Sequence, residues 1–285
     1  MKAPSRPALR WFGGKWLQAP KIISHFPAHR RYVEPYGGAA SVLLQKPRAP
    51  GAEVYNDLDD EVVNLFEVLC DDALAAKLER MVDLTPFSRT EFERAYEVSD
   101  NPVERARRLL IRSFMGFGAD GATGTYRTGF RANSTRAGTT PAHDWGNYPP
   151  VIGEIHRRLK RVTIERRPAL DVIRKHDGID TLIYADPPYP HETRQRVRRG
   201  SGENADGVYR HEMTDAEHVE MLELLLSVKG MVVLSGYACD LYDDRLKGWE
   251  RLEYAALADG ARPRREVLWI NPAAQAAHGL FGAVA

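Results

Sequence analysis

The chain of 285 residues contains only two cysteines, Cys70 and Cys239. Two thiols cannot build a disulfide framework or a cysteine-rich zinc module, and such scarcity is typical of proteins from a reducing compartment. The longest apolar runs, such as Met231–Leu234, are far shorter than the roughly 20 residues needed to cross a bilayer. The N-terminal segment also has no apolar core of signal-peptide length. We therefore expect a soluble, cytoplasmic protein without a membrane span.

The sequence has almost no net charge, since 40 Lys and Arg residues face 39 Asp and Glu residues. This balance excludes a uniformly polycationic molecule, so any affinity for nucleic acid must come from a local basic patch. Hydrophobic residues make up 43% of the chain and charged residues 28%, which excludes global disorder. A chain of this length buries roughly three quarters of its unfolded surface, enough for a large core. We expect one core domain with an inserted lobe.

Short apolar runs that end in polar turns indicate a parallel sheet. Five runs are expected to be strands, at residues 32–33, 53–55, 181–185, 230–235 and 267–270. The first three are followed by Glu34, Asp57 and Asp186, and a helical pattern at about 215–227 precedes the fourth. Strands that alternate with helices predict an α/β fold with a doubly wound, Rossmann-like sheet. In such folds the carboxyl ends of the strands face one cleft, where ligands bind.

The middle of the chain has a different composition. Apolar faces at helical spacing cover three stretches, residues 61–69, 73–82 and 103–114. Residues 115–150 are rich in Gly, Thr, Arg and aromatic side chains, which predicts loops or a small hairpin. Residues 156–161 are predicted to form the exposed face of a helix. We therefore assign residues 1–60 and 150–285 to the core domain, and residues 61–149 to an inserted, mainly helical lobe.

The most informative motif is Asp186-Pro187-Pro188-Tyr189, which follows a predicted strand. Two prolines remove two backbone donors and stiffen the turn, so a carboxylate, bare carbonyls and an aromatic ring are held in fixed positions. Asp186 and the Pro187 carbonyl can accept both N–H bonds of an exocyclic amino group while Tyr189 stacks on its ring. Accepting both bonds draws the nitrogen toward sp³ and frees its lone pair to attack. The alternative is a rigid polar turn without a ligand.

Five motifs in this order resemble the Dam-like (D12 class) family of site-specific DNA adenine-N6 methyltransferases. The matching segments are the N-terminal cofactor motif Trp11–Lys15, the glycine-rich loop Val33–Ser41, the acidic strand end Val54–Asp57, the cofactor-side acid in Pro168–Asp171, and the catalytic motif Asp186–Tyr189. They span about residues 10–60 and 160–272. In the glycine-rich loop the family usually has another glycine where this chain has Ala40.

The resemblance implies an enzyme that transfers a methyl group from S-adenosylmethionine to the N6 amino group of adenine in DNA. Residues 1–60 and 150–285 would be its catalytic domain, and residues 61–149 its target-recognition lobe. The implied catalytic residues are Asp186, Pro187, Pro188 and Tyr189. The implied cofactor-binding residues are Trp11, Lys15, Glu34, Pro35, Tyr36, Gly37, Gly38, Ala39, Ser41, Asp57, Asp171 and Asp186. No metal ion is expected, because the sulfonium already activates the methyl group.

Several of these side chains also have purely structural interpretations. Asp57 follows the glycines by about 20 residues, which favours hydrogen bonds to both ribose hydroxyls; the alternative is that it caps a helix. Glu34 could face the methionine part of the cofactor or be a buried helix cap. Lys15 could hold the cofactor carboxylate or a phosphate, or be a solvated lysine. Trp11 could line the cofactor site or simply be part of the hydrophobic core. Asp171 could bond the adenine amino group of the cofactor, or cap a helix.

A base inside a duplex cannot reach such a pocket, so the target must be flipped out, and single-stranded DNA should be accepted besides double-stranded DNA. Cations mixed with aromatic side chains suit phosphate contact and wedging between bases. The candidates are Tyr126, Arg127, Arg131, Arg194, Arg196, Arg198 and Arg199. The alternative is that these charges lie on solvated loops. A partner restriction endonuclease is compatible with the family but is not required for activity.

Three rival functions stay open at this point. The same cofactor could serve another amino-group substrate, such as an RNA base, cytosine N4 or a protein glutamine; Asn-Pro-Pro-Tyr enzymes act on such substrates. A nicotinamide-dependent enzyme could use a similar sheet, although the chain lacks a Gly-x-Gly-x-x-Gly run. The chain could also be a catalytically silent DNA-binding relic of the same fold.

Overall fold

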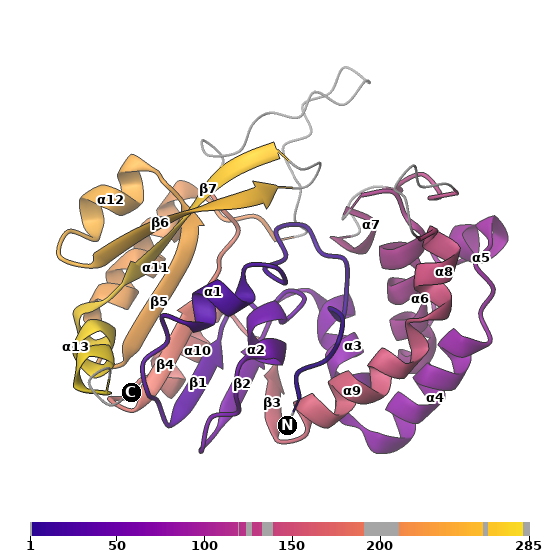
Figure 1. Cartoon of the computed structure of the whole chain (residues 1–285), viewed down its shortest axis with the longest axis horizontal. Helices are drawn as coiled ribbons and strands as arrows, with labels where there is room; N and C mark the ends of the chain where they lie inside the picture. Colours follow the sequence, from indigo (N-terminus) through magenta and orange to yellow (C-terminus); the bar gives the residue numbers. More distant parts are fainter. Residues whose placement is uncertain are drawn as a thin grey trace.

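The computed structural model describes residues 2–118, 120–123, 127–132, 139–190, 211–258 and 262–281 (Figure 1). The strands are β1 (Arg31–Glu34), β2 (Glu53–Asn56), β3 (Val162–Glu165), β4 (Thr181–Ala185), β5 (Met231–Tyr237), β6 (Glu250–Ala258) and β7 (Arg262–Ile270). The helices are α1 (Ala19–Ile23), α2 (Ser41–Gln45), α3 (Asp60–Cys70), α4 (Asp72–Asp83), α5 (Arg89–Arg94), α6 (Pro102–Met115), α7 (Asp120–Thr123), α8 (Pro141–Gly146), α9 (Pro149–Leu159), α10 (Ala169–His176), α11 (Asp215–Ser227), α12 (Asp240–Arg245) and α13 (Pro272–Phe281).

In the described part of the chain, seven strands form one sheet in the order β3-β2-β1-β4-β5-β7-β6. Strands β1 to β5 pair in parallel, whereas β7 is antiparallel to both of its neighbours, β5 and β6. From β1 the chain runs outward to β2 and β3, and then returns to build β4 and β5 on the other side of β1. The strand order therefore reverses between β1 and β4, where a ligand crevice is expected in such sheets. The predicted α/β, Rossmann-like fold is confirmed.

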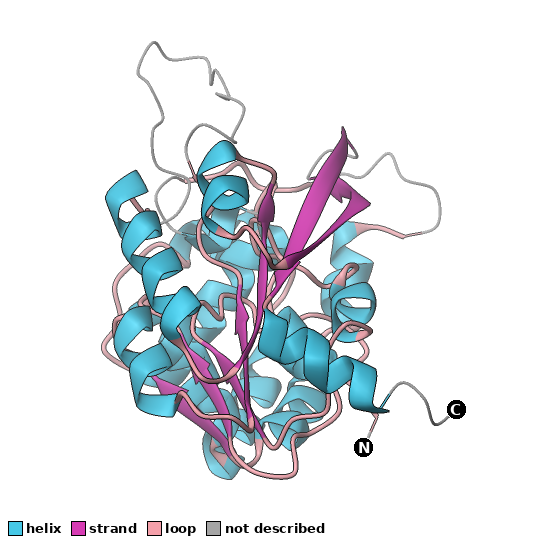
Figure 2. Cartoon of the chain, turned by 90° about the vertical axis from the view of Figure 1, so that its left-hand side faces the viewer, coloured by secondary structure: helices cyan, strands magenta, loops and turns pink. Residues whose placement is uncertain are grey.

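Alternating residues of the strands divide the core into two halves. On β4, Ile183 packs with helices α10, α11 and α12, while its neighbours Leu182 and Tyr184 pack with helices that include α1, α2 and α13. The same alternation separates Val232 from Val233 on β5. A strand points successive side chains to opposite faces, so continuous apolar runs such as β4 are buried on both. Figure 2 shows the sheet between the two helical layers.

Helices α3 to α9 lie between β2 and β3 in the chain and gather beside the β3 edge of the sheet (Figure 1). The three helices predicted at residues 61–69, 73–82 and 103–114 are present as α3, α4 and α6. Side chains of Asp59, Asp71 and Asn101 accept N–H bonds in their first turns, which explains where these helices begin. The role of residues 61–149 as a separate target-recognition lobe remains a prediction.

Other local predictions were incomplete. Residues 115–150 were predicted as loops or a hairpin, but they contain α7, α8 and the start of α9. Helix α8 is fixed by tertiary contacts, because Trp145 is buried and its Nε1 donates to the Thr85 carbonyl at 2.7 Å. Strands β3 and β6 were not predicted either. Among the described residues, every helix is too short or too polar to span a bilayer.

The prediction that residues 156–161 form an exposed helix face was wrong for three of them. His156, Arg158 and Leu159 are buried. The Arg158 guanidinium donates to both oxygens of Glu53 on β2, at 2.7 and 3.0 Å, and Lys46 Nζ lies 2.7 Å from the same carboxylate. A buried carboxylate that receives several charge-assisted hydrogen bonds compensates the cost of burying these cations. The sequence pattern contains no sign of this partner, because it comes from another element.

Candidate active site

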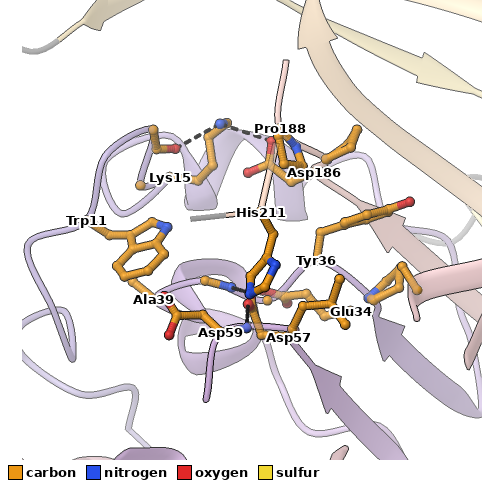
Figure 3. Close-up of a pocket in the computed structure, with 18 of the residues that line it drawn as sticks. Trp11, Lys15, Glu34, Tyr36, Ala39, Asp57, Asp59, Asp186, Pro188 and His211 are labelled. Atoms are coloured by element: carbon orange, nitrogen blue, oxygen red, sulfur yellow. Dashed lines mark hydrogen bonds and ion pairs between the residues drawn. The ribbon is translucent and has the colours of Figure 1, made fainter. Parts of the chain in front are cut away.

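A pocket lies at the carboxyl ends of β1, β2 and β4 (Figure 3). It brings together four segments that are far apart in the sequence: the N-terminal motif, the glycine-rich loop, the end of β2, and the corner after β4. The predicted site residues that line it are Trp11, Lys15, Glu34, Pro35, Tyr36, Gly37, Gly38, Ala39, Ser41, Asp57, Asp186, Pro187 and Pro188. The reversal of strand order between β1 and β4 explains why these segments meet there.

The loop after β1 needs glycine at two positions for different reasons. A Cβ atom on Gly37 would lie 2.1 Å from Cε2 of Tyr55, so only glycine fits against this ring. Gly38 has φ +46°, in the left-handed region that glycine adopts without steric cost. Ala40 also has a left-handed backbone, with φ 52°, which costs an L-residue roughly 1–2 kcal/mol. This geometry explains why a further glycine would suit the position of Ala40.

The Asp57 carboxylate connects two loops of the pocket. One oxygen accepts from the backbone N–H of Gly38 and the other from that of Asp59, both at 2.8 Å. The N-cap of α3 is Asp59, which accepts from Glu61, so Asp57 is not the helix cap. Burial raises the pKa of Asp57, and the two N–H bonds oppose that rise. Asp57 thus holds the glycine loop against the end of β2 and lines the pocket.

Asp186 and Lys15 form a largely buried ion pair in which Lys15 Nζ lies 3.1 Å from Asp186 Oδ1 (Figure 3). Lys15 Nζ also donates to the Gly13 carbonyl at 2.9 Å and lies 4.8 Å from the ring centre of Tyr189. The contacts of Asp186 with Lys15 and Tyr189 both use Oδ1, and Oδ2 has no hydrogen-bond partner among the described residues. Lys15 therefore orients the carboxylate while one oxygen stays open to the pocket. A bond from Lys15 to a cofactor carboxylate or phosphate remains a prediction.

Tyr189 closes the corner from behind and, unlike the other three residues of the predicted catalytic motif, is not among the residues that line the pocket. Its side chain is buried, and its ring meets that of Tyr237 edge to face with the centres 4.5 Å apart. Its hydroxyl donates to Glu266 Oε2 at 2.7 Å, and it lies 3.2 Å from Asp186 Oδ1 and 3.3 Å from Ser235 Oγ. Burial, followed by the charges of Asp186 and Glu266, raises the pKa of Tyr189 well above its ordinary value. The phenol therefore keeps its proton.

Glu34 is buried at the inner wall of the pocket. Its Oε2 accepts from the Tyr32 hydroxyl at 2.6 Å and from the backbone N–H of Leu43, in the first turn of α2, at 3.0 Å. Burial raises the pKa of Glu34 to about 8, and the nearby charge of Asp186 acts in the same direction. The N-cap residue of α2 is Ala40, so Glu34 is not the N-cap itself, although it accepts an N–H of the first turn of this helix. Glu34 also lines the pocket.

Asp171 does not join this group. It lies in the first turn of α10, its side chain is half exposed, and it pairs with Arg174 at 3.4 Å. The residues lining the pocket include Ala169 from this helix but not Asp171.

Of the predicted DNA contacts, Arg127 is exposed and its guanidinium lies 5.0 Å from the ring centre of Tyr96. Arg131 is partly exposed. Tyr126, Arg194, Arg196, Arg198 and Arg199 lie outside the described residues.

Residues 11–248 match the family described as D12 class N6 adenine-specific DNA methyltransferases. The chain belongs to this family. It is therefore a DNA methyltransferase that acts on N6 of adenine, with DNA as its substrate, and methyltransferases of this kind generally use S-adenosylmethionine. A search of curated proteins found no match to the chain. The matched segment contains the N-terminal motif, the glycine-rich loop and the corner at Asp186.

Replacement of Glu34 by glutamine should remove a pH dependence of stability in this methyltransferase. Between the ordinary pKa of 4.5 and about 8, the folded enzyme holds a proton that the unfolded chain has lost, so its stability falls as pH rises. Glutamine is neutral at every pH and its oxygen can accept both hydrogen bonds. At pH 9 the free energy of unfolding of the variant should therefore be higher than that of the wild type by at least about 1 kcal/mol. This difference raises Tm by roughly 2–4 °C.

Thermal unfolding from pH 5 to pH 9 measures this difference. The control is Glu67→Gln on α3, because Glu67 is exposed. Parallel Tm curves for the wild type and Glu34→Gln over the whole range would show that Glu34 is ionised in the folded enzyme.

Sequence reasoning missed a further wall of the pocket. It is formed by His211, Glu212, Met213 and Glu217, and His211 lies beside Asp57 (Figure 3). One local signal was present: Thr214 and Glu217 form a capping box at the start of α11, the Thr-x-x-Glu pattern that marks a helix start. Nothing in the sequence pointed to His211, because its place depends on how the chain returns to the end of β2.

Proposed function

We propose that the enzyme transfers a methyl group from S-adenosylmethionine to the N6 amino group of an adenine flipped out of DNA, and that Asp186–Tyr189 hold this amine. The observation that carries the proposal is the shared pocket. It is lined by the corner at Asp186, by Gly37 and Gly38 of the glycine-rich loop, and by Asp57. A donor bound over the glycine-rich loop and an acceptor held at Asp186 would therefore be neighbours.

The charges of the pocket favour a cationic ligand. Six carboxyl side chains line the described part of the pocket: Glu34, which holds its proton below about pH 8, and Asp57, Asp59, Asp186, Glu212 and Glu217. Lys15 is the single lysine or arginine among the lining residues that the structure describes, and it pairs with Asp186. S-adenosylmethionine carries a sulfonium and an ammonium, which suit these acids, whereas the pyrophosphate of a dinucleotide would be repelled. This contrast argues against a nicotinamide-dependent enzyme.

The binding roles follow from the geometry of each side chain. Asp57 and Asp59 present carboxylate oxygens at the end of β2, where they can accept from ribose hydroxyls. The bare backbone at Gly37 and Gly38 allows close approach of the ligand. Trp11 provides an aromatic surface on one side of the pocket (Figure 3). When bound, S-adenosylmethionine supplies a methyl group that its sulfonium has already activated.

The acceptor side of the reaction rests on Asp186. Its Oδ2 is available to accept one N–H of the target amine, and the Pro187 carbonyl can accept the other. The nitrogen becomes cationic as it attacks, so a fixed carboxylate stabilises the transition state more than the ground state. Lys15 fixes the orientation of that carboxylate, which makes positioning a large part of the acceleration.

Base flipping and recognition by the helical lobe belong to the same proposal. A stacked adenine presents its N6 to the major groove and cannot enter a pocket at the strand ends, so extrusion into the pocket is needed. Residues 61–149 would hold the duplex, and the exposed Arg127 would contact its phosphates.

A direct methylation assay tests the proposal. The purified enzyme is incubated with S-adenosylmethionine carrying a labelled methyl group and with plasmid DNA, and the digested nucleosides are analysed by mass spectrometry. Labelled N6-methyladenine is the expected product. Labelled N4-methylcytosine, or the absence of any labelled nucleoside from the DNA, would contradict it. Calorimetric titration with S-adenosylmethionine and NAD should give binding for the first alone.

A further inference from the structure

A second carboxylate stands behind the catalytic corner. Glu266 lies on β7, is 5% exposed, and accepts the hydroxyl proton of Tyr189 at 2.7 Å. The two residues are 77 positions apart, and they meet because β7 inserts antiparallel between β5 and β6. Register places Glu266 opposite Tyr237 on β5 and Tyr254 on β6. Glu266 has no part in the proposed transfer of the methyl group.

Two carboxylates lie within reach of one phenolic proton. The Tyr189 oxygen is 2.7 Å from Glu266 but 3.2 Å from Asp186, and a phenol has a single proton to donate. The shorter contact takes the proton, and burial strengthens it because the local dielectric is low. Ser235 Oγ, at 3.3 Å, can donate to the phenol oxygen without disturbing this arrangement.

Loss of the Glu266 carboxylate would redirect that proton. Among the residues that the structure describes, the nearest remaining acceptor is Asp186 Oδ1. A hydrogen bond there would draw electron density from the carboxylate that has to receive the target amine. The ring itself would stay in place, because Tyr237 packs against it edge to face and Lys15 lies over it. The change would therefore act on the acceptor strength of Asp186 rather than on the shape of the pocket.

We propose that Glu266 is a positioning residue that holds the hydroxyl proton of Tyr189, so that the Asp186 carboxylate remains free to accept the N–H bonds of the target amine. The inference rests on the proposed function, in which Asp186 receives that amine. In this arrangement the buried hydroxyl of Tyr189 is kept away from the catalytic carboxylate.

A double-mutant cycle with Tyr189→Phe tests this role. In the enzyme with Tyr189, Glu266→Ala should lower the single-turnover rate roughly tenfold, with dissociation constants for S-adenosylmethionine and DNA changed by less than about twofold. In the Tyr189→Phe background no phenol proton exists, so the same substitution should change the rate by less than about twofold. Glu266→Gln keeps the shape and a weaker, neutral acceptor, and should recover part of the rate.

The control is Glu253→Ala on β6, since Glu253 pairs with Arg251 and Arg265 away from the pocket and should leave the rate unchanged. Equal losses from Glu266→Ala in both backgrounds would overturn the proposal, because a structural role does not depend on the hydroxyl. A wild-type rate in Glu266→Ala would overturn it as well. If Glu266→Ala does not fold, Glu266→Gln carries the same cycle. Absence of adenine methylation by the wild type would refute the proposed function, whereas an active wild type with an unaffected Glu266→Ala refutes this inference alone.

Discussion

Replacement of Asp186 by alanine is expected to lower the rate of methyl transfer by roughly 10²-fold or more, because the target amine loses the acceptor that faces its developing charge. DNA affinity should change little, since phosphate contacts on other parts of the enzyme supply most of it. The measurement is a single-turnover rate at saturating S-adenosylmethionine, combined with a DNA dissociation constant. A rate within a few-fold of the wild type would refute the assignment of Asp186.

Alanine also removes the ion-pair partner of Lys15, which is 4% exposed, so stability must be checked in the same experiment. Asp186→Asn is the matched variant, because it keeps the shape and one acceptor oxygen while losing the charge. Its rate should lie between those of the wild type and Asp186→Ala. Asp244→Ala on α12 is the control, since Asp244 is exposed and pairs only with Lys247 in the described contacts.

Replacement of Gly37 by alanine is expected to lower the free energy of unfolding by roughly 1–3 kcal/mol, which is the usual cost of overpacking. The substitution should also weaken S-adenosylmethionine binding about tenfold or more, because a loss of 1.4 kcal/mol in binding free energy already raises Kd tenfold. The new Cβ would lie 2.1 Å from the Tyr55 ring. That ring cannot retreat, since it packs on Phe66 with centres 4.4 Å apart and its hydroxyl donates to the Gly38 carbonyl. The loop itself must move, and Gly38 with it, away from Asp57.

Chemical denaturation and calorimetric titration measure the two effects of Gly37→Ala. Gly146→Ala at the end of α8 is the matched control, because no atom lies within 4 Å of its added Cβ. Unchanged cofactor affinity in Gly37→Ala would contradict binding of the donor over the glycine-rich loop.

The sequence was most informative where local physics decides the outcome. An apolar run such as Thr181–Ala185 followed by two prolines predicts a buried strand with a rigid polar corner, and β4 has that form. Helices α3, α4 and α6 were predicted to within a few residues, because apolar periodicity and capping side chains both act over one or two turns. Arg158 shows the limit of such reasoning. Its charge predicted exposure, but Glu53 on β2 neutralises it in the core.

The sequence alone determined the strands that end at or just before Glu34, Asp57 and Asp186. Because parallel strands present their carboxyl ends at one edge, a common pocket was predictable. Only the tertiary structure decided the partners of the catalytic corner. Glu266 reaches Tyr189 through the order of strands in the sheet. Lys15 reaches Asp186 because the N-terminal segment also lines the pocket. Hydrophobic periodicity tells which face of a strand is buried, but it does not specify which strand lies beside it, and that neighbour depends on packing of the whole chain.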